Sequence, residues 1–205
     1  MPILRTLLAS LALLLAGGIG LSAATDRFQA FTTETARRIA VLKHPVNIPD
    51  VTLEDQSGVR TRFSDLHGKW LLVDFIYTRC PTFCTALGSE FAQLQDLLAG
   101  TLAQGRLQLL SISFDPAHDT PQQLSAYLQR SRDRGPNWLA ARPVDARGLD
   151  QLKQAFGITV IPDPSGGYTH NASIHVVDPQ GRLVEIFDMG NPAPIVQAML
   201  PRLGR

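Results

Sequence analysis

The chain has 205 residues, 44% of them hydrophobic, and a formal net charge of +1, which is enough for one globular domain with an extension. This charge balance, without a long basic stretch, argues against a nucleic-acid partner. Its two cysteines are too few for a disulfide-stapled scaffold, and a domain of this size does not need one.

Residues 1–24 have the composition of an export segment. Arg5 supplies a positive charge near the start, and residues 6–24 carry none. Two interpretations stay open: a signal peptide cleaved after residues 22–24, or an uncleaved membrane anchor, because the run approaches the roughly 20 residues that span a bilayer. Of the two we prefer the anchor. Both place the rest of the chain outside, beginning with a spacer at 25–47 that contains a short helix.

The domain is predicted to span residues 48–205 and to alternate strands with helices. An N-terminal β-hairpin is indicated by the alternation of residues 50–55 and 59–63 around a glycine turn. A Pro/Gly-rich loop is expected at 161–168. The other elements follow from apolar runs and helical periodicity, and are expected at 70–77 (strand), 85–103 (helix), 107–114 (strand), from 121 (helix), 138–141 (short strand), 149–156 (short helix), 173–178 and 183–187 (hairpin), and 193–203 (helix).

Both cysteines come directly after the first long strand, in the segment Cys80-Pro81-Thr82-Phe83-Cys84. Pro81 suits the first turn of a helix, so the thiols are expected at a helix N-terminus, where backbone N–H groups and the helix dipole favour thiolate. A dithiol at the first strand-to-helix connection of a βαβα pattern predicts a thioredoxin-like α/β fold. To it are added the N-terminal β-hairpin and the Pro/Gly-rich loop before the final β-hairpin.

The spacing of the two cysteines allows two kinds of chemistry. Residues four apart on one helix face have Cβ atoms about 5–6 Å apart, so the thiolates of Cys80 and Cys84 could share a metal ion. They could also form a disulfide if the first turn relaxes. A purely structural disulfide is disfavoured because so short a loop constrains the unfolded chain little.

A metal such as copper or zinc needs more ligands than two thiolates, and four side chains were considered. His175 lies inside an apolar strand, where it is expected to be a packed or edge histidine rather than a ligand. His118, near Asp115 at the end of a strand, fits a solvated turn equally well. His170 follows the Pro/Gly-rich loop, and position alone leaves it equally balanced between a ligand and an ordinary loop residue.

Several motifs in matching order resemble the SCO/SenC family. They are Gly68-Lys69-Trp70, Cys80-Pro81-x-x-Cys84, Ser113-Phe114-Asp115-Pro116-x-x-Asp119-Thr120, and His170 eight residues before Asp178-Pro179-x-Gly181. The resemblance covers roughly residues 48–190. It implies an exported, commonly membrane-anchored, thioredoxin-like domain that binds one copper ion, Cu(I) or Cu(II), through Cys80, Cys84 and His170.

The resemblance also implies a place and a set of partners. The place is the periplasmic side of the bacterial inner membrane, and the role is assembly of cytochrome c oxidase, as copper donor or thiol reductant for the CuA centre. The implied partners are the oxidase subunit that carries CuA, a periplasmic thiol reductase and another copper chaperone, with the membrane added if the N-terminal segment is uncleaved.

Two residues depart from the family pattern. Thr85 stands where proline often follows the second cysteine, and Thr169 stands where aspartate often precedes the histidine. The second departure matters more, because loss of a carboxylate that orients an imidazole commonly costs about 10–100-fold in metal affinity. Asp115 is a candidate to replace it in part.

Two thiolates and one imidazole favour copper over zinc, and three ligands leave an open position for transfer. Binding requires both cysteines reduced, so the site is also a redox switch. A carrier is therefore preferred to an enzyme. The leading alternative is a thiol–disulfide oxidoreductase that uses Cys80 and Cys84 without His170, although the spacing argues against efficient exchange. A peroxidase-like enzyme with Arg79 as partner residue, and a redox or copper sensor, are the remaining alternatives.

Overall fold

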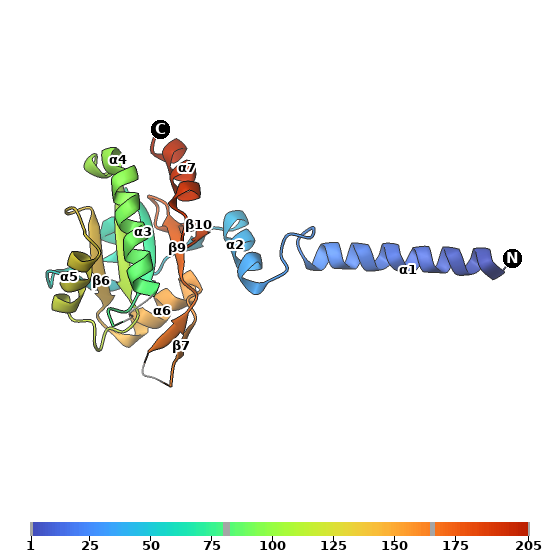
Figure 1. Cartoon of the computed structure of the whole chain (residues 1–205), viewed down its shortest axis with the longest axis horizontal. Coiled ribbons are helices and arrows are strands. Elements are labelled where there is room, and N and C mark those ends of the chain that lie inside the picture. Colours follow the sequence, from blue (N-terminus) through green and yellow to red (C-terminus); the bar gives the residue numbers. More distant parts are fainter. Residues whose placement is uncertain (1, 80–82, 165–166, 205) are drawn as a thin grey trace. The chain divides into compact units, whose positions relative to one another are not determined.

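The computed structural model describes residues 2–79, 83–164 and 167–204, and for residues 2 and 83–86 it describes the backbone alone. The chain forms two compact units, Met1–His44 and Pro45–Arg205. In chain order (Figure 1) the elements are α1 (Pro2–Ala24), α2 (Thr33–Lys43), β1 (Val46–Asn47), β2 (Thr52–Asp55), β3 (Arg60–Arg62), η1 (Phe63–Leu66), β4 (Trp70–Ile76), α3 (Phe83–Leu97), α4 (Ala99–Ala103), β5 (Leu107–Ser113), α5 (Pro121–Arg130), β6 (Trp138–Pro143), α6 (Ala146–Phe156), β7 (Val160–Pro162), β8 (Tyr168–His170), β9 (Ser173–Val177), β10 (Arg182–Asp188) and α7 (Pro192–Leu203).

The first unit consists of two helices. The segment Ile3–Ala24 of α1, with a mean hydropathy of 2.1, is long and apolar enough to cross a membrane, and a signal sequence has the same properties. The short helix expected in the spacer is present as α2. Its N-cap is Thr32, whose hydroxyl accepts a hydrogen bond from the Thr35 N–H.

The second unit is built on an eight-stranded sheet in the order β1-β10-β9-β4-β5-β6-β2-β3. Its centre is parallel, with β4 beside β5 and β5 beside β6, and β9 is antiparallel to β4. After Trp70, every residue of β4 is buried. This fits a central strand covered by helices on both faces, and it explains why a run that is apolar except for Asp74 predicted the strand.

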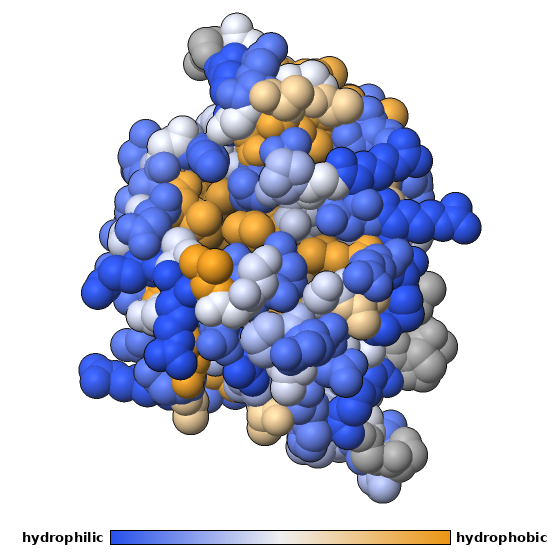
Figure 2. Space-filling view, turned by 90° about the vertical axis from the view of Figure 1, so that its left-hand side faces the viewer, coloured by the Kyte–Doolittle hydropathy of each residue, from blue (hydrophilic) through white to orange (hydrophobic). Residues whose placement is uncertain are grey.

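Helices cover both faces of this sheet. On one face, Phe91 of α3 and Tyr127 of α5 pack against Trp138 of β6, with ring centroids 5.4 and 6.1 Å apart. On the other face, Phe156 of α6 packs against Phe75 of β4 at 5.1 Å. The side of the molecule on which α5 lies is largely polar, with scattered apolar areas (Figure 2).

The helix expected over residues 85–103 is in fact two helices, α3 and α4. The break falls at Leu98, whose backbone leaves the helical region with φ −112° and ψ 17°. Each of Leu98 and Leu102 is only 2% exposed, so the bend buries two leucines. The gain in buried apolar surface explains why the regular period ends there.

The prediction of a loop at 161–168 is also wrong in part, because β7 and β8 form a short antiparallel pair there. Ile161 faces Thr169 in register, and Val160 faces His170. Each strand has three residues and the connection is rich in proline and glycine, so no alternating pattern was visible. His170 therefore ends a strand rather than a free loop.

Candidate metal centre

The two cysteines fall at the edge of what the structure describes. Cys80 lies outside the described residues, and Cys84 lies in the first turn of α3, where the backbone alone is described. β4 ends at Ile76 and α3 begins at Phe83, so the dithiol segment connects the central strand to a helix N-terminus. That connection is the one expected from the sequence.

A buried carboxylate fixes the chain just before the dithiol. Asp119 is fully buried, and its side chain accepts hydrogen bonds from the Thr78 N–H at 3.0 Å and the Thr78 hydroxyl at 2.6 Å. The Ser113 hydroxyl at the end of β5 donates a third, at 2.6 Å. Three donors on one carboxylate tie the end of β4 to the end of β5. The sequence showed Asp119 only as part of a motif, without this role.

Asp115, next to this anchor, is paired on both oxygens. The Arg79 guanidinium lies 2.8 Å from one oxygen and His118 Nδ1 lies 2.8 Å from the other. Arg79, considered above as a peroxidase-type partner, and His118, considered as a ligand, are thus both engaged with this carboxylate. A contact between Asp115 and His170, the one proposed to replace the missing aspartate, is not among those of the described residues.

His170 is half-buried, and its imidazole has no polar partner among the described residues. Both imidazole nitrogens are shielded from solvent, and neither forms a hydrogen bond within the described part of the chain. Burial lowers the pKa of His170, so the ring is neutral at pH 7. A neutral imidazole with a free lone pair is the form that binds a metal ion.

Aromatic rings hold His170 at the carboxyl end of the parallel strands. Its ring packs edge-on against Phe114, with centroids 4.9 Å apart, and Phe114 follows β5 directly. Tyr77, which follows β4, packs against Phe114 at 5.3 Å and against Tyr168 at 5.2 Å. The Tyr168 N–H donates to the Tyr77 hydroxyl at 3.3 Å. These rings were not singled out from the sequence, although the positions of Tyr77 and Phe114 at strand ends were a usable signal.

The other predicted positions have clear environments. His175 is fully buried between Phe75 and Phe156, which confirms that it is a core residue. Thr169 is exposed, and since neighbouring strand residues point to opposite faces, its side chain is directed away from that of His170. An aspartate at 169 would then not contact the imidazole directly, so this departure costs less than the sequence suggested.

A second buried carboxyl lies beneath α3, in the middle of β4. Asp74 is fully buried, and within the described residues neither oxygen accepts a hydrogen bond of normal geometry. Burial raises the pKa of Asp74 to about 7; the facing Ser111 hydroxyl opposes this shift and the charge of Glu90 adds to it. Asp74 thus holds a proton at pH values where an ordinary aspartate is ionised.

Comparison with known proteins identifies the family. The SCO1/SenC family model matches residues 43–203. The chain belongs to the SCO1/SenC family. A Stutzerimonas stutzeri protein named for copper binding is 33% identical over 187 residues, which cover 89% of this chain and 88% of that protein.

Solved SCO structures agree with the fold. A SCO1/SenC family lipoprotein from Bacillus anthracis has a TM-score of 0.71 at 24% identity, over 80% of this chain and 99% of that one. ScoI of Bradyrhizobium japonicum, solved with copper bound, has a TM-score of 0.64 at 24% identity, over 77% and 99% of the two chains. The thioredoxin-like α/β fold is thereby confirmed. The Sco family consists of cytochrome c oxidase assembly proteins.

Proposed function

We propose that the chain binds one copper ion through Cys80, Cys84 and His170. The observation that carries this proposal is the His170 imidazole, whose two nitrogens are buried and have no partner among the described residues. A buried polar group without a hydrogen bond is costly, and a metal ion would remove that cost. Cys80 and Cys84 would supply two soft ligands: β4, which precedes them in the chain, ends at the same edge of the sheet as β5, and Phe114, which follows β5, packs against His170.

The donor set suits a carrier. Two thiolates and an imidazole favour copper, and three protein ligands leave a position at which a partner's ligand can enter before the first bonds break. Both thiols must lose their protons on binding, so affinity rises with pH and disappears when the pair is oxidised. Copper is cargo here, held until a partner accepts it.

The cellular role we propose is metallation of the CuA centre of cytochrome c oxidase. It rests on family membership and on the copper-binding relatives. We assign residues 1–24 to a membrane anchor or cleaved signal, 25–47 to a spacer and 48–205 to the copper-binding domain, on the periplasmic side of the inner membrane. A thiol reductase would keep the cysteines reduced, and a second copper chaperone would load the site.

Copper binding by the reduced full-length chain in detergent tests the proposal. Metal content and the Cu(II) visible spectrum should show one copper per chain and a sulfur-to-copper charge-transfer band. His170→Ala should weaken binding at least tenfold, a loss typical of a disturbed metal site. The matched control is His67→Ala, which removes an exposed histidine that precedes β4, whereas the dithiol follows that strand.

Binding that is absent, or that His170→Ala leaves unchanged, would contradict the copper site. The thiol–disulfide oxidoreductase would then lead, and it makes an opposite prediction. Reduction of a disulfide substrate would require Cys80 and Cys84 and would be indifferent to His170→Ala. Variants of Cys80, Cys84 and His170, each measured in both assays, therefore separate the two functions.

A further inference from the structure

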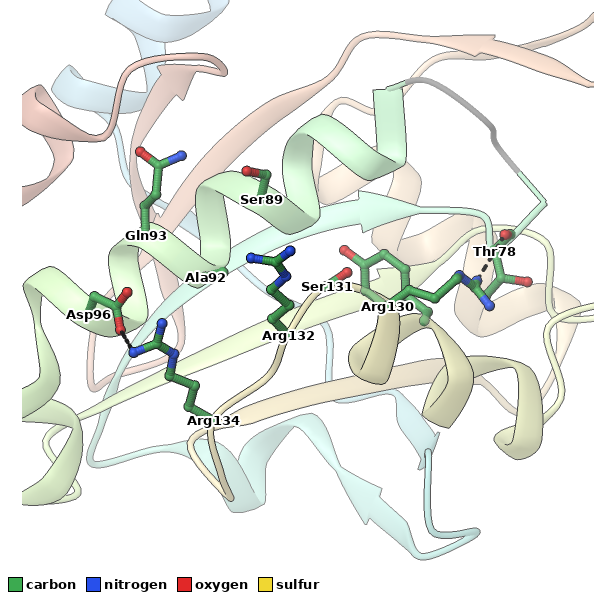
Figure 3. A pocket seen from close by; sticks show the side chains of 10 residues that line it. Thr78, Ser89, Ala92, Gln93, Asp96, Arg130, Ser131, Arg132 and Arg134 are labelled. Carbon is green, nitrogen blue, oxygen red and sulfur yellow. Dashed lines mark hydrogen bonds and ion pairs between the residues drawn. The ribbon is translucent and has the colours of Figure 1, made fainter.

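A hollow of about 580 Å³ opens between α3 and the chain that leaves α5. Three arginines line it in alternating positions: Arg130, Arg132 and Arg134. Figure 3 shows them in a row beside α3, from Arg134 next to Asp96 to Arg130 next to Thr78. Asp96 is the one acidic residue in the lining, so three positive charges meet one negative charge.

The three guanidinium groups are available for a ligand. Arg132 forms no side-chain hydrogen bond or ion pair within the described residues, and the Arg130 contact with the Thr78 carbonyl is long, at 3.5 Å. Arg134 pairs with Asp96 at 2.7 Å, but these side chains are 65% and 47% exposed. Such surface pairs are weak, so an incoming carboxylate can replace Asp96.

The backbone at Arg132 is unusual. Its φ is +62°, in the left-handed region that favours glycine, directly after the C-cap of α5. Asp26, Arg27 and Phe28 of the first unit also have positive φ, but within the described part of the second unit the other positive-φ residues are glycines, such as Gly135 close by. An arginine kept in a conformation that disfavours it suggests that its side chain is needed.

The hollow is close to the dithiol along the chain. Thr78, which lines one end, precedes Cys80 by two residues and is fixed by Asp119. A Cβ at Gly88 would collide with the Ser131 side chain, so the glycine lets α3 approach the end of α5 closely. From Ser89 to Asp96, α3 provides a wall about 10 Å long at 1.5 Å per residue.

We infer that this hollow docks an acidic, extended segment of the protein that exchanges copper or electrons with the dithiol. Carboxylates at alternate positions of an extended chain lie about 6.6 Å apart, so two of them fit along the wall. Arginine forks bind carboxylates in bidentate fashion, which gives orientation as well as attraction. The hollow would thus align the partner with the metal centre. The identity of the partner rests on the proposed function; the docking itself does not.

Peptide binding by the copper-free, full-length chain in detergent tests this inference. The probe is a fluorescein-labelled ten-residue peptide of alternating glutamate and glycine, followed by fluorescence anisotropy, and its control replaces each glutamate with glutamine. The glutamate peptide should bind at low salt and weaken as salt rises, whereas the glutamine peptide should not bind. Equal binding of the two peptides would overturn the inference.

Arg132→Gly is the most informative variant, because glycine suits the backbone at this position. It should weaken glutamate-peptide binding about tenfold or more while the melting temperature stays equal or rises. Arg147→Ala, which removes an exposed arginine on α6, should leave binding unchanged. The inference would be overturned if Arg132→Gly bound the glutamate peptide as tightly as the native chain does. It would also be overturned if inorganic phosphate, at equal total charge, displaced the labelled peptide as well as unlabelled peptide does.

Two further readings separate docking from the copper proposal. Arg132→Gly should still bind one copper per chain. Its transfer of copper to the acceptor protein should be slower than that of the native chain only when the acceptor concentration is low. If the native chain binds the peptide but no copper, the proposed metal centre is rejected and the inferred docking surface stands.

Discussion

Two buried aspartates, Asp74 within β4 and Asp119 in the connection between β5 and α5, show how differently one fold can treat a carboxyl group. Asp119 receives three hydrogen bonds from Thr78 and Ser113, and so stabilises the chain before the dithiol. Asp74, inside β4, is equally buried but has no such donors in the described structure, and its pKa is raised to about 7. Pairing, not burial, decides whether a carboxyl group holds the structure together or stores a proton.

The largest effect is expected from removing the paired carboxylate. Asp119→Ala leaves the Thr78 and Ser113 donors unsatisfied in a buried place, and should lower the free energy of unfolding by about 3–5 kcal/mol. Urea unfolding of the full chain measures this. Asp150→Ala, at a carboxylate that is 73% exposed, is the control. A loss below 1 kcal/mol would show that Asp119 is not the anchor described here.

Asp74, the carboxyl group without hydrogen-bond donors in the described structure, should instead make the folded chain less stable as pH rises. Between the ordinary aspartate pKa near 4 and about 7, the folded chain keeps a proton that the unfolded chain has released. Stability from this group is complete below pH 4 and is lost as pH rises through 7, by at most about 4 kcal/mol. Asp74→Asn should flatten this dependence and stabilise the chain at pH 8 relative to the wild type. Parallel pH–stability curves for the two proteins would contradict the raised pKa.

His170 extends the comparison to an unpaired base. Its pKa is lowered by burial against Phe114, so Phe114→Leu should raise the pKa towards the ordinary value of about 6.5. NMR titration of the copper-free chain follows the ring protons. The stability loss should be about 1 kcal/mol, as for other substitutions between large apolar residues. A pKa that does not move would mean that the ring of Phe114 does not shield the imidazole.

The smallest effect is expected where pairing occurs at the surface. The Arg79 side chain is 48% exposed, and Asp115 keeps His118 when this arginine is removed. Arg79→Ala should therefore change the free energy of unfolding by no more than about 1 kcal/mol. Thermal unfolding at low and high salt provides the measurement. The difference in stability between Arg79→Ala and the wild type should shrink as salt rises. A loss comparable to that of Asp119→Ala would make Arg79 part of the anchor.

Local patterns in the sequence predicted the central strands, the order of elements and the core position of His175, because burial on a strand or a helix face leaves a short-range periodicity. The same reasoning joined α3 to α4 and missed β7 and β8. A break that buries Leu98, or a pairing of three-residue strands, depends on neighbours that no local window contains.

The side-chain environments were beyond the sequence for the same reason. The motif Asp115 to Asp119 was visible, yet the bond between Asp119 and Thr78 joins residues 41 apart. Arg130, Arg132 and Arg134 were not singled out from the sequence, because the hollow that they line exists only where α3 forms its other side.

The sequence by itself determined the apolar N-terminal helix and the thioredoxin-like order of strands and helices, since both depend on residue type and spacing. The three side chains proposed to bind copper came from its resemblance to the SCO/SenC family. Only the tertiary structure decided which carboxyl groups are paired, that His170 lacks a polar partner among the described residues, and that three arginines line one hollow. The electrostatic environment of a side chain depends on its distances to residues that are far away in the sequence, and only folding sets those distances.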